Sequence, residues 1–268
     1  MAELVTLERP REGVALVTMT NPAIHNHGSW AGISELAAAL KEAREGGARV
    51  SVLASGVAGH WYEHAWLTDL HAMFHGKPTS GDPMGWFHTL TELARVEVVA
   101  IAAISGSCSG GGAEIGWACD LRIAEEQATF GQPEVMIGVA TGVGGTSRLM
   151  RLIGCTAAAE MVLDGAPLPA RRIYELGGLN RVVPEGKALE VSLAWAERLA
   201  ERPAGSLRAL KQMLNDAENL HLGEALENKQ KLFQGVAGSR EGRKGMKRIQ
   251  DRFDAGESLI EVYGHPRP

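Results

Sequence analysis

The chain has 268 residues, of which 45% are hydrophobic, and its formal net charge is -5 at pH 7. This length suits one large α/β domain, with or without a small appendage, and the apolar content is enough for a sizeable core. The acidic balance argues against nucleic acid as a partner, and no apolar run is long enough to span a membrane. Because the three cysteines are few and odd in number and no secretory leader is recognised, we expect a cytoplasmic protein with reduced thiols.

Hydrophobic periodicity predicts strands alternating with helices in the first part of the chain. The expected strands are residues 4–7, 14–19, 50–54, 98–104, 121–124 and 128–130. The expected helices are residues 34–44, a weak helix that ends near Phe74, and residues 86–95 and 145–153. The polar, Gly/Pro-rich residues 75–85 are expected to form a mobile loop. This alternation predicts a layered α/β core.

The second part of the chain is expected to be helical. The predicted helices are residues 156–163, 170–176, 187–201, 206–217, 223–233 and 239–253. Residues 264–268 are expected to be disordered. We therefore predict a core domain over residues 1–200 and a C-terminal helical region over residues 201–268.

A glycine-rich stretch follows the strand predicted at residues 98–104. Residues 105–109 are expected to form a turn of small residues, and Gly110, Gly111 and Gly112 then lead into a helix whose first turn carries Glu114. The N–H groups of a first helical turn have no intrahelical partner, so they can bind an oxygen that becomes negative during a reaction. A glycine turn for tight packing, with a capping glutamate, explains the same pattern equally well.

A second candidate acid is Glu134, which follows the turn-like segment 130–133. Two carboxyl groups in glycine-rich, apolar surroundings can hold one water molecule between them, and burial can raise the pKa of one of them. The alternative is that Glu114 and Glu134 are two unrelated surface glutamates.

Residues 60–67 crowd two tryptophans, a tyrosine and two histidines into a chain that is only 5% aromatic. His60 and His64, and likewise His71 and His75, are four residues apart, as zinc ligands on a helix would be. No H-E-x-x-H pattern is formed, so we predict no metal site and interpret the histidines as cavity-lining or surface residues.

These motifs together resemble the enoyl-CoA hydratase/isomerase (crotonase) superfamily. The resemblance is carried by linked motifs over some fifty residues, namely Gly110-Gly111-Gly112-x-Glu114, Cys119-Asp120, Arg122-Ile123-Ala124, the run from Ala128 to Glu134, Gly144-Gly145-Thr146 and Arg148-Leu149. A weaker resemblance covers residues 14–40 and the helical C-terminal region. The resemblance implies a spiral of ββα units with a C-terminal helical region used for trimer packing, and a homotrimer or homohexamer.

The resemblance also implies a reaction. Members bind acyl-CoA thioesters and stabilise an enolate oxygen with two backbone N–H groups, which map here to Gly111 and Glu63. Glu114 and Glu134 correspond to the two glutamates of the hydratase branch, where one activates a water for attack at Cβ and the other exchanges a proton with Cα. The implied activity is that of an enoyl-CoA hydratase, a hydro-lyase, with no cofactor beyond the coenzyme A of its substrate.

The sequence departs from the family pattern where substrate is expected to bind. The segment usually written F-S-A-G-A-D-L reads W-Y-E-H-A-W-L here, so Glu63 replaces a small residue, His64 a glycine and Trp66 an aspartate. The coenzyme A turn is also altered, reading A-I-H-N-H from residue 23. The expected substrate-binding residues are Ala23, His25, Ala65, Trp66, Leu67, Gly110 and Gly142.

Two other functions remain open from the sequence. One is a different crotonase reaction, such as double-bond isomerisation, C–C hydrolysis or decarboxylation, that uses the altered segment at residues 61–67. The other is a catalytically weak member that binds a partner such as RNA, which the net charge of -5 and the two retained glutamates argue against.

Overall fold

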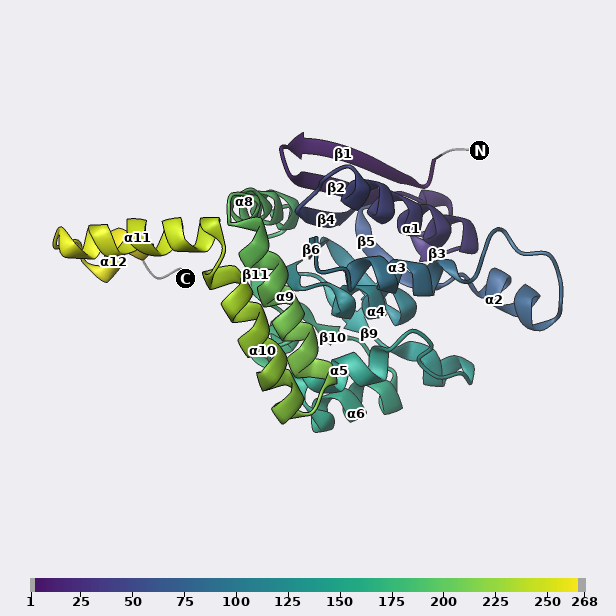
Figure 1. Cartoon of the computed structure of the whole chain (residues 1–268). Coiled ribbons are helices and arrows are strands. Elements are labelled where there is room, and N and C mark those ends of the chain that lie inside the picture. The colour runs from purple at the N-terminus through teal and green to yellow at the C-terminus, as the bar shows by residue number, and fades with distance from the viewer. Residues whose placement is uncertain (1–2, 265–268) are drawn as a thin grey trace. The chain divides into compact units, whose positions relative to one another are not determined.

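The computed structural model describes residues 3–264, so residues 265–268, for which disorder was expected, lie outside the described part. The chain divides into two compact units, one ending at Glu201 and one beginning at Arg202. The first unit contains both sheets, and the second consists of helices (Figure 1).

The first sheet has six strands within the described residues, in the order β1-β2-β4-β6-β8-β11. Only β1 and β2 pair antiparallel, and the other neighbours are parallel. Its strands are β1 Val5–Arg11, β2 Val14–Met19, β4 Val50–Ser55, β6 Val99–Ile104, β8 Leu121–Glu125 and β11 Arg181–Val183. The edge strand β1 extends beyond the predicted residues 4–7 and includes Pro10, which an edge with an irregular register tolerates.

The second sheet has five described strands in the order β10-β9-β7-β5-β3, and all pairs except β9–β10 are parallel. Its strands are β3 His27–Gly28, β5 Gly59–Ala65, β7 Gly106–Ser109, β9 Thr129–Gly131 and β10 Leu168–Pro169. The turn expected over residues 105–109 is therefore wrong, because β7 occupies most of it. Small residues fit there since an added Cβ on Gly106 would lie 2.3 Å from the backbone of Gly59.

The two sheets are built from one repeated unit. A strand enters the first sheet, the next strand enters the second sheet, and a helix follows, as in β6-β7-α4, where α4 is Gly110–Ala118. The same order holds for β2-β3-α1, with α1 Trp30–Glu45, and for β8-β9-α5, with α5 Gly145–Ile153. This spiral of ββα units confirms the predicted fold class.

The first sheet is buried on both faces, as its parallel strands require. Val14, Val52 and Ile101 pack on one face with alanines of α8 Ala188–Ala200, whereas Val17 and Leu53 belong to the core on the opposite face. Side chains alternate between the faces along each strand, so one run of apolar residues supplies two cores.

The remaining helices of the first unit are α2 Leu67–Phe74, α3 Gly85–Leu93, α6 Cys155–Asp164 and α7 Ala170–Glu175, with 3-10 helices Pro22–Ile24 and Pro133–Ile137. Helix α1 begins before the predicted residue 34 because the Ser29 side chain caps it by accepting the N–H of Gly32 at 3.1 Å. Helices α1 and α3 pack side by side (Figure 1).

The second unit contains α9 Ala204–Asn219, α10 Leu222–Ala237, α11 Arg240–Asp254 and α12 Leu259–Tyr263. Helix α12 was not predicted; its start is fixed by a capping box between Ser258 and Glu261. Exposed apolar side chains lie along these helices, among them Leu214, Phe233 and Met246. Within residues 3–264, no helix is both long and apolar enough to cross a lipid bilayer.

Candidate active site

A cavity of about 490 Å³ opens in the first unit and contains both candidate acids. Its lining comes from α1, α2, α3, the start of α4, the end of β5 and the segment from Glu134 to Val143. Of the residues predicted to form the site, the cavity is lined by Ala65, Leu67, Gly111, Glu114, Glu134 and Gly142. Residues far apart in the sequence therefore meet at one site, as the linked motifs indicated.

Glu114 is 2% exposed and lies on α4, two residues after Gly112. Its carboxyl group accepts the N–H of Gly145, the first residue of α5, at 2.5 Å and that of Val143, which precedes the helix, at 3.2 Å. Burial raises its pKa to about 7, and the charge of Glu134 adds to the rise, against the lowering by the two N–H groups. At neutral pH this carboxyl group can both accept and donate a proton.

Glu134 is half-buried on the 3-10 helix Pro133–Ile137, and burial likewise raises its pKa, while the nearby His64 lowers it. Gln132, which the sequence analysis missed, is fully buried beneath it. With its amide nitrogen turned toward Glu134, Gln132 donates to both carboxyl oxygens at 3.1 and 3.2 Å and accepts the indole N–H of Trp117 at 3.3 Å. Gln132 thus orients Glu134. In the sequence, the only indication of this role was that Gln132 is a polar residue between Gly131 and Pro133.

The glycines themselves form the first turn of α4, which begins at Gly110 rather than after Gly112. Gly111 is at the second helical position, where its N–H has no intrahelical acceptor. No side chain fits at these positions, because an added Cβ would lie 2.7 Å from the Trp86 ring at Gly111 and 2.1 Å from the Tyr62 carbonyl oxygen at Gly112. Gly110, which was also expected to bind substrate, is not among the lining residues; its φ is +47°, and an added Cβ would lie 3.2 Å from the Glu134 carboxyl. The space around α4 therefore requires glycine, as the tight-packing interpretation of this turn predicts. The N–H of Gly111 still faces no intrahelical acceptor, so the oxygen-binding interpretation stays open.

The assignment of the second enolate-binding N–H to Glu63 is wrong. The N–H of Glu63 donates to the carbonyl oxygen of Asn26 at 3.0 Å, and Glu63 does not line the cavity. Its side chain is 5% exposed and accepts hydrogen bonds from Ser107, from Ser109 at 2.5 Å and from His60 at 2.8 Å. Burial raises its pKa, but these hydrogen bonds outweigh that effect and the pKa lies below its usual value. Glu63 is a structural residue that ties β5 to β7.

Ala65, two residues after Glu63 on β5, lines the cavity instead of Glu63. The N–H of Glu63 pairs with Asn26, and the next N–H on β5 to pair with this stretch, that of Trp66, donates to the carbonyl oxygen of Gly28 at 3.0 Å. Between these two hydrogen bonds, β5 advances three residues while the partner segment advances two. This irregularity is a β-bulge, a feature that redirects the backbone next to active sites. Ala65 lies within the bulge and lines the cavity, between His64, whose Nδ1 is 2.9 Å from the Ala65 oxygen, and Trp66.

The expected coenzyme A turn lies outside the cavity lining. Ala23 and His25 are exposed, and the His25 ring lies 5.0 Å from that of His60. The following Asn26 is buried and has a φ of 56°, and the NH2 group of its side chain lies within hydrogen-bond distance of three oxygens, those of Met19, Ser55 and Trp61. Asparagine tolerates this left-handed conformation better than most residues, so Asn26 fixes the turn that holds β5. Trp66 packs its ring edge against His27 at 5.6 Å instead of lining the cavity.

The histidines are divided among different surroundings. His60 and His64 lie on a strand rather than on one helix face, and His71 stacks on His75 at 4.0 Å on the surface. Within residues 3–264, no group of three or more His, Cys, Asp or Glu side chains is placed to hold a metal ion. All three cysteines, Cys108, Cys119 and Cys155, are free thiols.

The chain is similar in sequence and fold to known proteins. The family model described as enoyl-CoA hydratase/isomerase matches residues 9–255. A crystal structure of an enoyl-CoA hydratase subunit from Geobacillus kaustophilus superposes with a TM-score of 0.83 and 29% identity, covering 96% of this chain and 98% of that chain.

Two curated relatives also cover most of the chain. A probable mitochondrial enoyl-CoA hydratase of Dictyostelium discoideum is 31% identical over 233 residues, 87% of this chain and 83% of the relative. The 2,3-dehydroadipyl-CoA hydratase of Escherichia coli K12 is 30% identical over 250 residues, 92% of this chain and 94% of the relative.

Proposed function

Because the chain belongs to the enoyl-CoA hydratase/isomerase family, we propose that it adds water across the 2,3 double bond of an enoyl-CoA thioester to give a 3-hydroxyacyl-CoA. The observation that carries the proposal is that Glu114 and Glu134 line one cavity together with Gly111 at the start of α4. The substrate brings coenzyme A, and the proposed reaction uses no other cofactor.

In the proposed reaction the backbone stabilises the developing enolate. The thioester oxygen gains negative charge as water adds, and the N–H groups of Gly111 and Ala65 donate to it. Such donors bind the transition state more strongly than the ground state, and one donor is worth roughly 3–4 kcal/mol. The free position of Gly111 in the first helical turn and the bulge at Ala65 support this pairing in place of Gly111 and Glu63.

The two glutamates divide the proton transfers. Glu114 takes a proton from the water as its oxygen attacks Cβ, and Glu134 delivers a proton to Cα, so the elements of one water are added and the double bond is lost. A pKa of about 7 suits Glu114 to the role of base near neutral pH. Gln132 holds Glu134 in place through its amide.

We further propose that the enzyme is a homotrimer or homohexamer in the cytoplasm. The exposed apolar side chains on α9, α10 and α11 support assembly, since monomeric proteins rarely leave many such residues in water. Three free thiols support a reducing compartment.

The test is hydration of 2-butenoyl-CoA and 2-octenoyl-CoA, followed by loss of the enoyl-thioester absorbance and by identification of the product. We expect a 3-hydroxyacyl-CoA from the wild type and a loss of about 10²–10⁴-fold in kcat for Glu114→Gln and for Glu134→Gln. A shifted double bond or a shortened acyl group as the product would instead assign another reaction of the family.

A further inference from the structure

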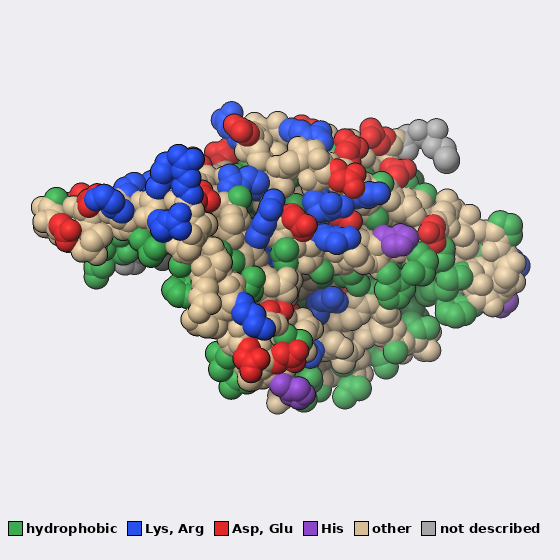
Figure 2. Space-filling view, in the orientation of Figure 1, with side chains coloured by type: hydrophobic (Ala, Val, Ile, Leu, Met, Phe, Trp, Pro, Cys, Tyr) green, Lys and Arg blue, Asp and Glu red, His purple; other side chains and the backbone are tan. Residues whose placement is uncertain are grey.

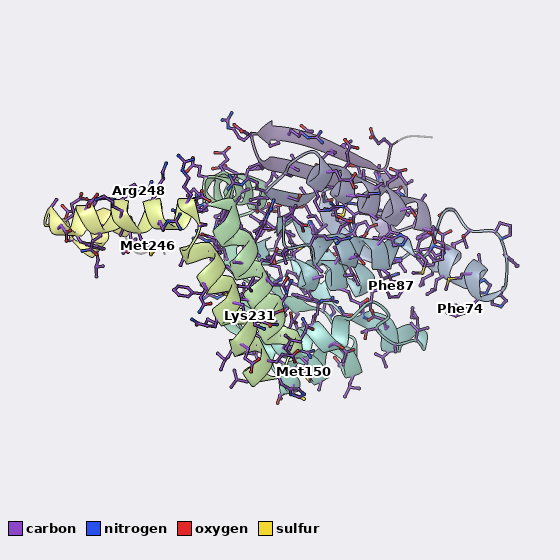
Figure 3. The ribbon with its side chains drawn as sticks, viewed as in Figure 1. Phe74, Phe87, Met150, Lys231, Met246 and Arg248 are labelled. Carbon is purple, nitrogen blue, oxygen red and sulfur yellow. The ribbon has the colours of Figure 1, made fainter. Side chains whose placement is uncertain are left out.

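The cavity lining contains more aromatic side chains than a short acyl group needs. Aromatic residues make up 5% of the chain, yet the lining contains Trp30, Phe74, Trp86 and Phe87. These rings come from three helices, α1, α2 and α3. Figure 3 shows Phe74 and Phe87 on neighbouring helices at the same end of the first unit.

The two phenylalanines are unusually exposed for their size. Phe74 is 75% exposed and Phe87 is 49% exposed, and Figure 2 shows apolar side chains gathering around this end of α2 and α3. Large apolar groups gathered at a cavity mouth indicate a ligand that covers them. Because they continue the lining that contains Glu114 and Glu134, the ligand they fit is the far end of the acyl group.

The cavity lining is mostly apolar. His64, Glu114 and Glu134 are the titratable side chains among its described lining residues, and no lysine or arginine is among them. The other described lining residues are all glycines or apolar side chains, among them Leu70, Met73 and the aromatic rings. A carboxylate at the end of an acyl chain would lose its hydration there without a cation to pair with, and the two glutamates would repel it.

The rings also favour a flat, rigid group. Trp86 packs directly on Gly111, with two ring atoms 2.7 Å from where a Cβ would be, so its indole borders the reacting end of the cavity. Phe87 follows it on α3, and Met73 adds an adaptable thioether that makes favourable contacts with rings. A ring in the acyl group can pack edge-to-face with these side chains, which a flexible alkyl chain cannot do.

We propose that the preferred substrate is an enoyl-CoA whose double bond carries an aryl group, a 3-arylpropenoyl-CoA, rather than a short-chain or a carboxylated enoyl-CoA. This proposal rests on the proposed hydratase activity for its kinetic test but not for its binding test. Hydration of such a substrate places the new hydroxyl on the carbon that bears the ring and the new hydrogen on Cα.

The kinetic test compares 3-phenylpropenoyl-CoA with 2-butenoyl-CoA, 2-octenoyl-CoA and 2,3-dehydroadipyl-CoA. We expect kcat/KM for the phenyl substrate to exceed that for the butenoyl and dehydroadipyl substrates by about tenfold or more, and to be at least equal to that for the octenoyl substrate. Any other order overturns the proposal.

Two variants locate the effect. Phe87→Leu keeps an apolar side chain but removes the ring, so it should lower the ratio of kcat/KM for the phenyl substrate to kcat/KM for the octenoyl substrate, which measures the preference. Tyr174→Ala is the matched control, because Tyr174 is an exposed aromatic residue on α7 that does not line the cavity. An unchanged preference in Phe87→Leu, or an equal loss in Tyr174→Ala, contradicts the role assigned to the rings.

Calorimetry with saturated thioesters separates this proposal from the reaction. We expect 3-phenylpropanoyl-CoA to bind about tenfold more tightly than butanoyl-CoA or adipyl-CoA. If no enoyl-CoA is hydrated but this order of binding holds, the hydratase proposal fails and the ligand class stands. If all three bind equally, the ligand class fails whatever the activity.

Discussion

Two glutamates, Glu63 on β5 and Glu114 on α4, are both buried but have opposite surroundings. Glu63 accepts hydrogen bonds from two serines and a histidine, and its pKa lies below the usual value. Glu114 has two backbone N–H groups, lines a cavity, and burial raises its pKa to about 7. A buried carboxyl group with enough donors stabilises the fold, whereas one with too few donors keeps a proton that it can transfer.

Strand β5 and helix α4 also differ in which residue types they accept. On β5 the usual small residue and glycine are replaced by Glu63 and His64, and the strand still reaches the cavity with the backbone of Ala65. On α4 the glycines are irreplaceable, because Tyr62 and Trp86 occupy the space around them. Around a backbone N–H donor, the residue type is restricted to glycine only where another group already occupies the space that a side chain would need.

The largest expected effect separates the two glutamates by activity. Glu114→Gln should lose about 10²–10⁴-fold in kcat, because the group that accepts a proton is gone. Glu63→Gln should retain activity of the same order as the wild type. In the wild type, kcat/KM should rise as the pH rises through about 7, where Glu114 ionises, and Glu63→Gln should keep this profile. An unchanged profile in Glu114→Gln would show that another group titrates.

The second effect tests the space around α4. Gly112→Ala places a Cβ 2.1 Å from the Tyr62 carbonyl oxygen and 2.8 Å from that of Glu63. Overpacking against backbone should lower the free energy of unfolding by about 3 kcal/mol or more. Gly116→Ala on the same helix is the control, since its Cβ would lie 3.4 Å from Trp61 and should add about 0.5–1 kcal/mol. Equal urea midpoints for the two variants would contradict the assigned crowding.

The third effect concerns the stability that Glu63 provides. Glu63→Gln should lower the free energy of unfolding at pH 7 by about 2 kcal/mol, because hydrogen bonds to a charged carboxylate are replaced by weaker ones. A lowered pKa in the folded state stabilises the protein above the ordinary carboxyl value of 4.5, and this contribution is lost as the pH falls below it. The difference between wild type and Glu63→Gln should therefore shrink in acid.

Thermal unfolding between neutral and acid pH measures this difference. Glu8→Gln is the control, because Glu8 is an exposed strand residue. A gap between wild type and Glu63→Gln that stays constant with pH, or a similar loss in Glu8→Gln, would show that the carboxylate itself is not the stabilising group.

Periodicity predicted the elements that have long apolar runs. Residues 14–19 and 145–153 agree with β2 and α5 residue for residue. The missed strands β3, β5, β7, β10 and β11 are short, polar or rich in small residues, and they form by pairing with strands distant in the chain. A local pattern carries little information about such pairing.

The motifs of α4 and of residues 130–134 predicted site residues correctly, whereas the altered segment on β5 did so only in part. Glu114 and Glu134 were predicted from motifs, and both line the cavity. The choice between Glu63 and Ala65 depends on a bulge in β5, which no spacing of residue types reveals. Gln132 was missed because its role arises from burial against Glu134, which only the fold establishes.

The smallest expected effect connects the two regions. The Ser109 hydroxyl donates to Glu63 at 2.5 Å and accepts the N–H of His64 at 3.2 Å, so it joins the structural carboxylate to the residue before Ala65. Ser109→Ala should lower the free energy of unfolding by about 1 kcal/mol and, by loosening the backbone at Ala65, lower kcat with little change in KM. Ser107→Ala is the control, because Ser107 bonds Glu63 but not His64. A loss of kcat in Ser109→Ala alone would show that the Glu63 network positions the enolate donor, and equal kinetics in both variants would limit the network to stability.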